Sequence, residues 1–419
     1  MKDRRLAIIF AVVLVDMLSF SIVLPLLPYL AVEVGASETQ IGLLTAMYPL
    51  AQMFAAPLLG RLSDRVGRKP VLVISIIGTS IGFVVLALAR LLPILFVSRF
   101  IDGVTGGNIS VAQAYIADVT DDRERGKALG LIGAAFGLGF ILGPLTGGLL
   151  SGFGYAVPAW AGACLAAANA LAVALFVPES LSAEARSRLA ARPKRRFINV
   201  EGLRHSLAHP RVGPLLSIRF FTSLSFAIFE TSFALWAIAA LGITAQVNGM
   251  VLAYVGVLSV FVQLFLIGRL TARYSDDTLI LWCVGIAAVS LAVWGFVPGI
   301  GLLVVLMPAL SLGLAVTNTI VTSALSKAVG RDEVGGVLGL QASIMSFTRI
   351  PAPVIAGLLI ERVSVWAPGA VAGGVAGLMV PYAYVKLCVH PDRKSCPEDD
   401  PLGRPPTEPA PPESAERNP

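Results

Sequence analysis

The chain has 419 residues, of which 56% are hydrophobic and only 14% are charged, and its mean hydropathy is +0.80. This composition excludes an ordinary soluble domain. The formal net charge of +6 would suit a nucleic-acid-binding protein, but the placement of the basic residues, described below, argues against that class. We therefore expect an integral membrane protein that contacts the lipid bilayer and binds no nucleic acid.

Twelve apolar segments are each long enough to cross about 30 Å of hydrocarbon as a helix, at about 1.5 Å per residue. The first follows a basic N-terminus, as a signal peptide would, but it is too long for one and lacks an A-x-A cleavage site, so we expect a retained helix. The pattern predicts an all-α polytopic membrane protein with spans at residues 6–31, 39–60, 70–90, 92–117, 126–151, 156–177, 213–241, 246–268, 277–297, 300–325, 335–360 and 367–389.

The 32 Lys and Arg residues lie almost entirely at the termini and in every second loop. Arg90 and Arg362 fall in the opposite loops, and three arginines fall within or at the edge of spans: Arg99, Arg219 and Arg349. Under the positive-inside rule, this bias places both termini in the cytoplasm. We expect a multi-pass protein of the inner or plasma membrane.

Residues 178–212 interrupt the hydrophobic pattern and form a basic cytoplasmic linker between six spans on each side. The flanking halves, residues 1–177 and 213–389, are related in sequence, because Gly60–Val66 recurs as Gly268–Tyr274 at an offset of 208 residues. Two related six-helix halves with a binding site at their interface are typical of transporters.

The tail and the cysteines give no sign of a site. Residues 390–419 are rich in proline and poor in apolar side chains, which predicts a disordered cytoplasmic tail. The cysteines have no paired or metal-type spacing, so we interpret them as small, reduced apolar residues: Cys164, Cys283, Cys388 and Cys396.

Asp16 lies about ten residues into the first span. Desolvation penalises the charged form of a carboxyl at this depth, which makes Asp16 able to take up and release a proton. The alternative is a structural role, in which Asp16 bonds to a neighbouring helix.

The segment from Gly60 to Pro70, called here the signature loop, is a tight and highly charged turn between the second and third spans. Its pattern Gly-x-Leu-x-Asp-Arg-x-Gly-Arg-Lys resembles the loop between helices 2 and 3 of the major facilitator superfamily. The resemblance implies that Asp64 caps the start of helix 11, that Arg68 pairs with Asp118, and that this network holds the cytoplasmic side closed. The loop residues matching the pattern or expected to act as a gate are Gly60, Asp64, Arg65, Gly67, Arg68 and Lys69.

The fourth span contains Arg99, Asp102 and Asn108. Here the chain resembles the drug/proton antiporter branch, the bacterial tetracycline/proton antiporters within it, and the animal tetracycline-transporter-like proteins. By resemblance Arg99 is the helix-4 arginine implicated in proton coupling. An unpaired guanidinium in hydrocarbon costs at least about 2.5–3.5 kcal/mol, so we expect it to face a wet cavity or a carboxylate such as Asp102. The alternative is an ion pair that merely locks the helix.

The fifth span contains a glycine-rich stretch. Glycines at helical spacing allow helices to approach closely, and a proline bends the span. The pattern G-P-x-x-G-G is similar to the antiporter signature of the superfamily, although generic small-residue packing is the alternative. The residues concerned are Gly139, Gly143, Pro144, Gly147 and Gly148.

Glu230 lies in the middle of the seventh span beside Phe226 and Phe229, a setting that would suit an organic cation. The bacterial tetracycline antiporters tend to lack this acid, whereas the animal relatives have it. Arg349 in the eleventh span also resembles the animal relatives. It would either neutralise Glu230 or bind an anion, so Glu230 is a substrate or proton site or else the partner of Arg349.

These features predict a monomeric transporter that exports small amphipathic or drug-like compounds in exchange for protons by alternating access. Its partners would be lipid, a small-molecule substrate and protons. We expect no enzymatic activity, no metal and no cofactor, and we expect the proton gradient to drive the cycle. The glycine-rich residues 103–107 do not predict a phosphate-binding loop, because they lie inside a span without a following Lys-Ser/Thr. The alternatives are a facilitator or symporter of an organic anion or metabolite, and a non-transporting receptor or accessory protein.

Overall fold

The computed structural model describes residues 2–120, 122–182, 184, 186–187, 206–330 and 333–389. Within these ranges the chain forms helices joined by turns, and eleven helices are long and apolar enough to cross a membrane. The first half contains α1 (Lys2–Val23), η1 (Leu24–Leu26), α2 (Leu27–Glu33), α3 (Glu38–Val66), α4 (Arg68–Ala87), α5 (Leu92–Thr105), α6 (Asn108–Val119), α7 (Asp122–Ser151) and α8 (Ala156–Phe176). The second contains α11 (Val212–Leu241), α12 (Ala245–Phe261), η2 (Val262–Leu266), α13 (Ile267–Arg273), α14 (Asp276–Trp294), α15 (Ile300–Lys327), α16 (Val334–Thr348), α17 (Pro351–Arg362), α18 (Ala367–Ala383) and η3 (Tyr384–Val389).

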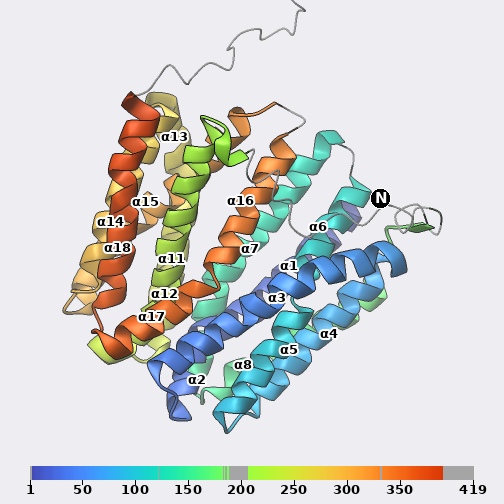
Figure 1. Ribbon diagram of the computed structural model, residues 1–419. Coiled ribbons are helices and arrows are strands. Elements are labelled where there is room, and N and C mark those ends of the chain that lie inside the picture. Colours follow the sequence, from blue (N-terminus) through green and yellow to red (C-terminus); the bar gives the residue numbers. More distant parts are fainter. Residues whose placement is uncertain are drawn as a thin grey trace, which may run out of the picture.

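The helices are grouped in two halves, α1–α8 in blue to teal and α11–α18 in green to red (Figure 1). The halves meet along two helix pairs, α7 with α12 and α3 with α17. Large apolar side chains such as Phe261, Leu264 and Val305 remain exposed on the helices, as expected where a bilayer replaces water. The predicted all-α polytopic architecture is confirmed.

The predicted span 92–117 is present but interrupted. It consists of α5 and α6, each shorter than the other predicted crossings, joined at Gly106 and Gly107. A Cβ on Gly107 would lie 2.6 Å from Cδ1 of Leu59, so the small residue lets this break pack tightly against α3. The twelfth expected crossing is therefore a broken helix, which explains why eleven continuous spans are found.

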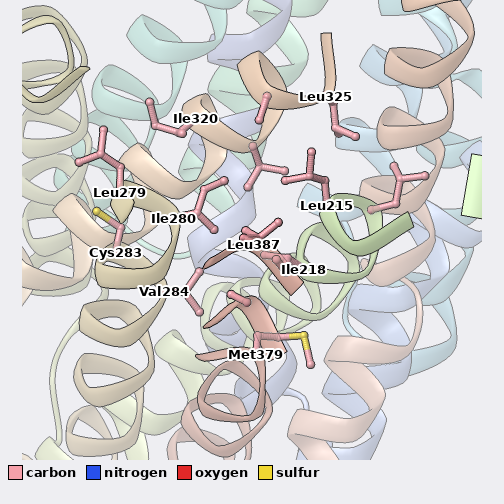
Figure 2. Packing of buried hydrophobic residues seen from close by; sticks show 14 of the residues in the cluster. Leu215, Ile218, Leu279, Ile280, Cys283, Val284, Ile320, Leu325, Met379 and Leu387 are labelled. Carbon is pink, nitrogen blue, oxygen red and sulfur yellow. The ribbon is translucent and has the colours of Figure 1, made fainter. Parts of the chain in front are cut away.

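Each half has its own apolar core. One cluster in the second half joins α11, α14, α15 and α18, and includes Leu215, Ile280, Val284 and Leu325 (Figure 2). A corresponding cluster of the first half lies among α1, α4, α6, α7 and α8. Because these cores are formed within a half, the surface between the halves is left to form a cavity.

The signature loop is shorter than the sequence suggests. The prediction of a turn from Gly60 to Pro70 was wrong, because α3 continues to Val66 and α4 begins at Arg68. Gly67 alone reverses the chain, with φ of +112°, a conformation that favours glycine. The charged residues before it stay helical, and Asp64 and Arg68 form an i, i+4 pair across the turn.

Most of the predicted linker, the whole predicted tail and Cys396 lie outside the described residues. Cys164, Cys283 and Cys388 are free thiols.

Candidate functional site

A cavity of about 290 Å³ lies between the two halves. Its wall is largely apolar and aromatic, with Phe20, Phe140 and Phe226 among its members, as is usual for small-molecule sites. Polar and charged residues also line it, and those considered below are Tyr48, Gln52, Arg99, Glu230 and Arg349. The cavity can therefore hold an amphipathic molecule and offer it a few polar contacts.

Asp16 is buried on α1 and does not belong to the cavity wall that the described residues form. The Nδ2 of Asn108 donates a hydrogen bond of 2.6 Å to Oδ1 of Asp16. The break between α5 and α6 makes this contact possible, because it leaves Asn108 as the first residue of α6. The structure thus brings together two residues that the sequence placed in one functional set.

Arg99 and Asp102 form an ion pair on α5, with 3.2 Å between Nη1 and Oδ2. Both are buried, and the guanidinium also lies 5.5 Å from the ring centroid of Phe83. Arg99 reaches the cavity wall, whereas Asp102 does not. The predicted pairing is present, and it neutralises most of the charge that Arg99 presents to the cavity.

Tyr48 and Gln52 were missed at the sequence level. The Nε2 of Gln52 donates to the hydroxyl of Tyr48 at 2.9 Å and to the carbonyl of Gly106 at 2.6 Å, which satisfies a backbone group at the α5–α6 break. Two polar residues spaced i, i+4 within an apolar span were the available signal.

Glu230 on α11 and Arg349 at the end of α16 form an ion pair, with 3.3 Å between Oε2 and Nη2. Unlike the pair on α5, this one is open to the cavity, since 22% of the Glu230 side chain and 45% of the Arg349 side chain are exposed. Of the two sequence alternatives, the partnership with Arg349 is present, and its exposure also leaves Glu230 within reach of a ligand.

The glycine-rich stretch of α7 packs on two helices. A Cβ on Gly143 would clash with Ser21 of α1, and one on Gly147 would lie 2.3 Å from the carbonyl oxygen of Ile22. On α12, a Cβ on Gly249 would lie 2.3 Å from the carbonyl oxygen of Pro144 and 2.9 Å from Cα of Gly148. At Pro144 and Gly148 the stretch therefore forms a close contact between the halves. Gly139 packs on Met17 of α1, within the first half.

The other contact between the halves, α3 with α17, is equally close at one end. Cβ atoms on Gly42 and Gly357 would each lie 2.3 Å from a backbone oxygen of the other half. Hydrogen bonds link the halves at this same end. The backbone N–H of Thr39 donates to Oε2 of Glu361 at 2.9 Å, and the hydroxyl of Tyr29 donates to the carbonyl oxygen of Ile243 at 3.0 Å. The opposite end is looser: Cβ atoms on Gly60, Gly133, Gly268 and Gly339 would meet nothing within 4 Å.

The signature loop lies at the looser end, and the ion pairs of Arg68 lie within the first half. Arg68 bonds Asp64 at 2.6 Å and Asp118 at 2.9 Å, so the predicted Arg68–Asp118 pair is present. In this conformation Asp64 pairs with Arg68, and its predicted role as a cap of α16 in the closed state stays a prediction. Gly67 is buried, Arg65 is exposed, and Lys69 contributes its backbone N–H.

Glu179 completes this network and was not predicted. Its carboxylate accepts hydrogen bonds from the backbone N–H groups of Arg68 at 2.9 Å and Lys69 at 3.1 Å, at the positive end of α4. A Cβ on Gly67 would lie 2.3 Å from Oε2 of Glu179, so the glycine also makes room for this acid. A partner 111 residues away from Arg68 leaves no local signal in the sequence.

Comparison with known proteins agrees with this geometry. The family model of the Major Facilitator Superfamily matches residues 9–229 and 215–417. The chain is 32% identical to tetracycline resistance protein, class C, of Escherichia coli over 84% of this chain and 89% of that protein. It is 28% identical to multidrug resistance protein 2 of Bacillus subtilis (strain 168) over 84% and 88%. The nucleoside transporter NupG superimposes with a TM-score of 0.73 at 14% identity, covering 92% of this chain and 99% of that one. The chain belongs to the major facilitator superfamily, and it is a multi-pass membrane transporter protein and not an enzyme.

Proposed function

We propose that the protein exports small amphipathic compounds in exchange for protons by alternating access. The observation that carries this proposal is a buried carboxylate, Asp16, bonded to Asn108 beside an apolar cavity but outside its wall. A proton and a substrate can then occupy different places at the same time. The names of the two resistance proteins support an exported, drug-like substrate.

The chemistry at Asp16 suits a proton carrier. Burial penalises the ionised carboxylate, whereas the N–H donated by Asn108 stabilises it, so both protonation states are accessible to the group. Arg99 supplies the link to the cavity, because it lies in the wall and pairs with Asp102 behind it.

The close contacts at α3–α17 and α7–α12 support the conformational part of the cycle. The basic loops mark the looser end as cytoplasmic, so this conformation is closed to the outside and accepts substrate from the cytoplasm. Rocking of the two halves separates the glycine contacts and opens the outer end. In this conformation Arg68 of the signature loop bonds Asp64 and Asp118 of the first half. We propose that the loop engages the second half when the cytoplasmic end closes.

An organic-anion facilitator using Arg99 and Arg349 is less well supported, because each of these arginines already has a carboxylate partner. A non-transporting receptor has no need for charges buried at such cost.

The test is proton movement in proteoliposomes. The purified protein is reconstituted with a pH-sensitive dye inside, and lipophilic cations, tetracyclines and organic anions are added in turn. We expect at least one compound to move protons through the wild type and not through Asp16→Asn. Asp276→Asn is the matched control, because Asp276 pairs with Lys327 at the surface, far from the cavity wall. Proton movement by Asp16→Asn at the wild-type rate would contradict the proposal.

A further inference from the structure

A second cavity, of about 240 Å³, lies inside the second half. It is lined from α11, α12, α14, α15, α16 and α18, and it shares Phe226, Phe229 and Gln263 with the wall of the cavity between the halves. Gln263 lies on η2, a single π turn that interrupts the helix there. Because the two cavities share these residues, the second, called here the recess, adjoins the first.

Arg219 lines this recess and has no acidic partner among the described residues. It is 4% exposed, its Nε makes no hydrogen bond, and its Nη2 contacts the thioether of Met345 at 2.6 Å, a weak acceptor. The other arginines buried or near the cavity, Arg68, Arg99 and Arg349, each pair with a carboxylate. A buried guanidinium without such a partner is costly, so this recess favours a ligand that carries an anionic group.

The recess also contains unused hydroxyl groups. Ser311 and Thr317 of α15 are buried in its wall, and their hydroxyls have no hydrogen-bond partner. The guanidinium of Arg219 matches the two oxygens of a carboxylate, which arginine binds with two parallel hydrogen bonds. Its positive charge disfavours a cation at the same place.

The position of Arg219 on α11 indicates the length of the apolar part of the ligand. Phe226 follows seven residues later on the same helix, about 10 Å along its axis at about 1.5 Å per residue. A molecule with its carboxylate at Arg219 would thus have an apolar body of this length against Phe226, which lines both cavities.

We propose that Arg219 binds the carboxylate of the transported compound, and that the unbonded hydroxyls of the recess are available to other polar groups of that compound. The inference rests on the proposed function in that the compound is the exported substrate, and it narrows the substrate class to amphipathic molecules with a carboxylate, including zwitterions. Sequence analysis placed Arg219 in a span but gave no sign that it lacks a partner. The anion site therefore consists of different residues from the proton site and lies in the other half of the protein.

The binding test needs no proton gradient. Biphenyl-4-carboxylate and the matched amide, biphenyl-4-carboxamide, are titrated into purified wild-type protein by calorimetry, and chloride is titrated separately. We expect the carboxylate to bind at least tenfold more tightly than the amide. We expect chloride, titrated alone, to bind weakly. Equal affinities for the two biphenyl compounds would overturn the proposal, and so would tight chloride binding with no preference for the carboxylate.

Variants assign the preference to Arg219. We expect Arg219→Gln to abolish the tenfold preference and Arg219→Lys to retain part of it, since the charge remains without the fork of N–H donors. Arg90→Gln removes an exposed arginine in a loop and should keep the full preference. Retention of the preference by folded Arg219→Gln would overturn the proposal. If that variant does not fold, the comparison of Arg219→Lys with the wild type decides, and an unchanged preference there contradicts bidentate binding.

The two proposals fail separately. Carboxylate preference without proton movement in proteoliposomes would overturn proton exchange and leave the anion site intact. Proton movement driven by lipophilic cations, with no carboxylate preference, would overturn the anion site and leave the exchange mechanism intact.

Discussion

The charged groups discussed above differ between the two halves in their hydrogen-bond and ion-pair partners. In the first half Asp16, Arg68 and Arg99 are buried, and each bonds a partner from the same half. In the second half Glu230 and Arg349 pair in the open wall of the cavity, and Arg219 is buried without an acid among the described residues.

This difference separates two tasks. Asp16 and Arg68 lie outside the cavity wall and can change protonation or conformation without meeting the substrate, whereas Glu230, Arg349 and Arg219 line a cavity and meet whatever enters it, as Arg99 of the first half does. We infer that the first half carries the proton and the signature loop, and that the second half recognises the substrate. The three predictions below would break or sharpen this division, in order of expected effect.

The largest effect is expected where the halves touch. Gly249→Ala places a Cβ 2.3 Å from the carbonyl oxygen of Pro144, and a backbone atom cannot move aside easily. Overpacking of this kind costs about 1–3 kcal/mol, which would shift the population away from the outward-closed conformation by about 5–150-fold. The measurement is the distance distribution between spin labels at positions 36 and 363, at the closed end.

Gly133→Ala is the matched control, because a Cβ there meets nothing within 4 Å. The two variants should differ clearly in label separation. An identical distribution for both would mean that the α7–α12 contact does not set the conformation.

A smaller effect is expected at Glu230. Glu230→Gln should weaken the binding of lipophilic cations by about tenfold (about 1.4 kcal/mol) and leave neutral compounds unaffected. The pair with Arg349 is exposed, so its coupling free energy in a double-mutant cycle with Arg349→Gln should stay below about 1 kcal/mol. Equal loss of cations and neutral compounds, or a rescue of stability in the double variant, would make Glu230 the structural partner of Arg349.

The smallest effect is expected in the signature loop. Asp64→Asn removes one of two carboxylates that bond Arg68, and Asp118 remains. A partly exposed pair contributes about 0.2–1 kcal/mol, so turnover should slow by up to about fivefold with little change in substrate affinity. Asp276→Asn tests the surface of the other half in the same assay. A loss of affinity of more than about tenfold, with conformational populations unchanged, would place Asp64 in the binding site instead.

Hydropathy predicted the spans well, because every backbone polar group in a bilayer must be bonded within a helix. The segment 156–177 corresponds to α8, Ala156–Phe176. The same reasoning failed at Gly106 and Gly107, where an apolar segment breaks in two, since hydropathy is insensitive to a helix that ends inside the membrane. It also failed at Gly60, because α3 continues as a helix beyond the apolar segment to Val66.

The site was predicted in part. Residue type and depth were enough to select Asp16, Arg99 and Glu230, because charges in a bilayer are rare and functional. The environment of each charge depends on side chains far away in sequence, so no local pattern showed that Glu179 holds the start of α4 or that Arg219 lacks a carboxylate.

The most direct test of the division between the halves compares two transport modes in Asp16→Asn. Substrate counterflow needs binding and conformational exchange, whereas uptake driven by a pH gradient also needs the proton site. We predict that Asp16→Asn keeps counterflow near the wild-type rate and loses gradient-driven uptake. Loss of both modes, or retention of both, would contradict the assignment of the proton to the first half and the substrate to the second.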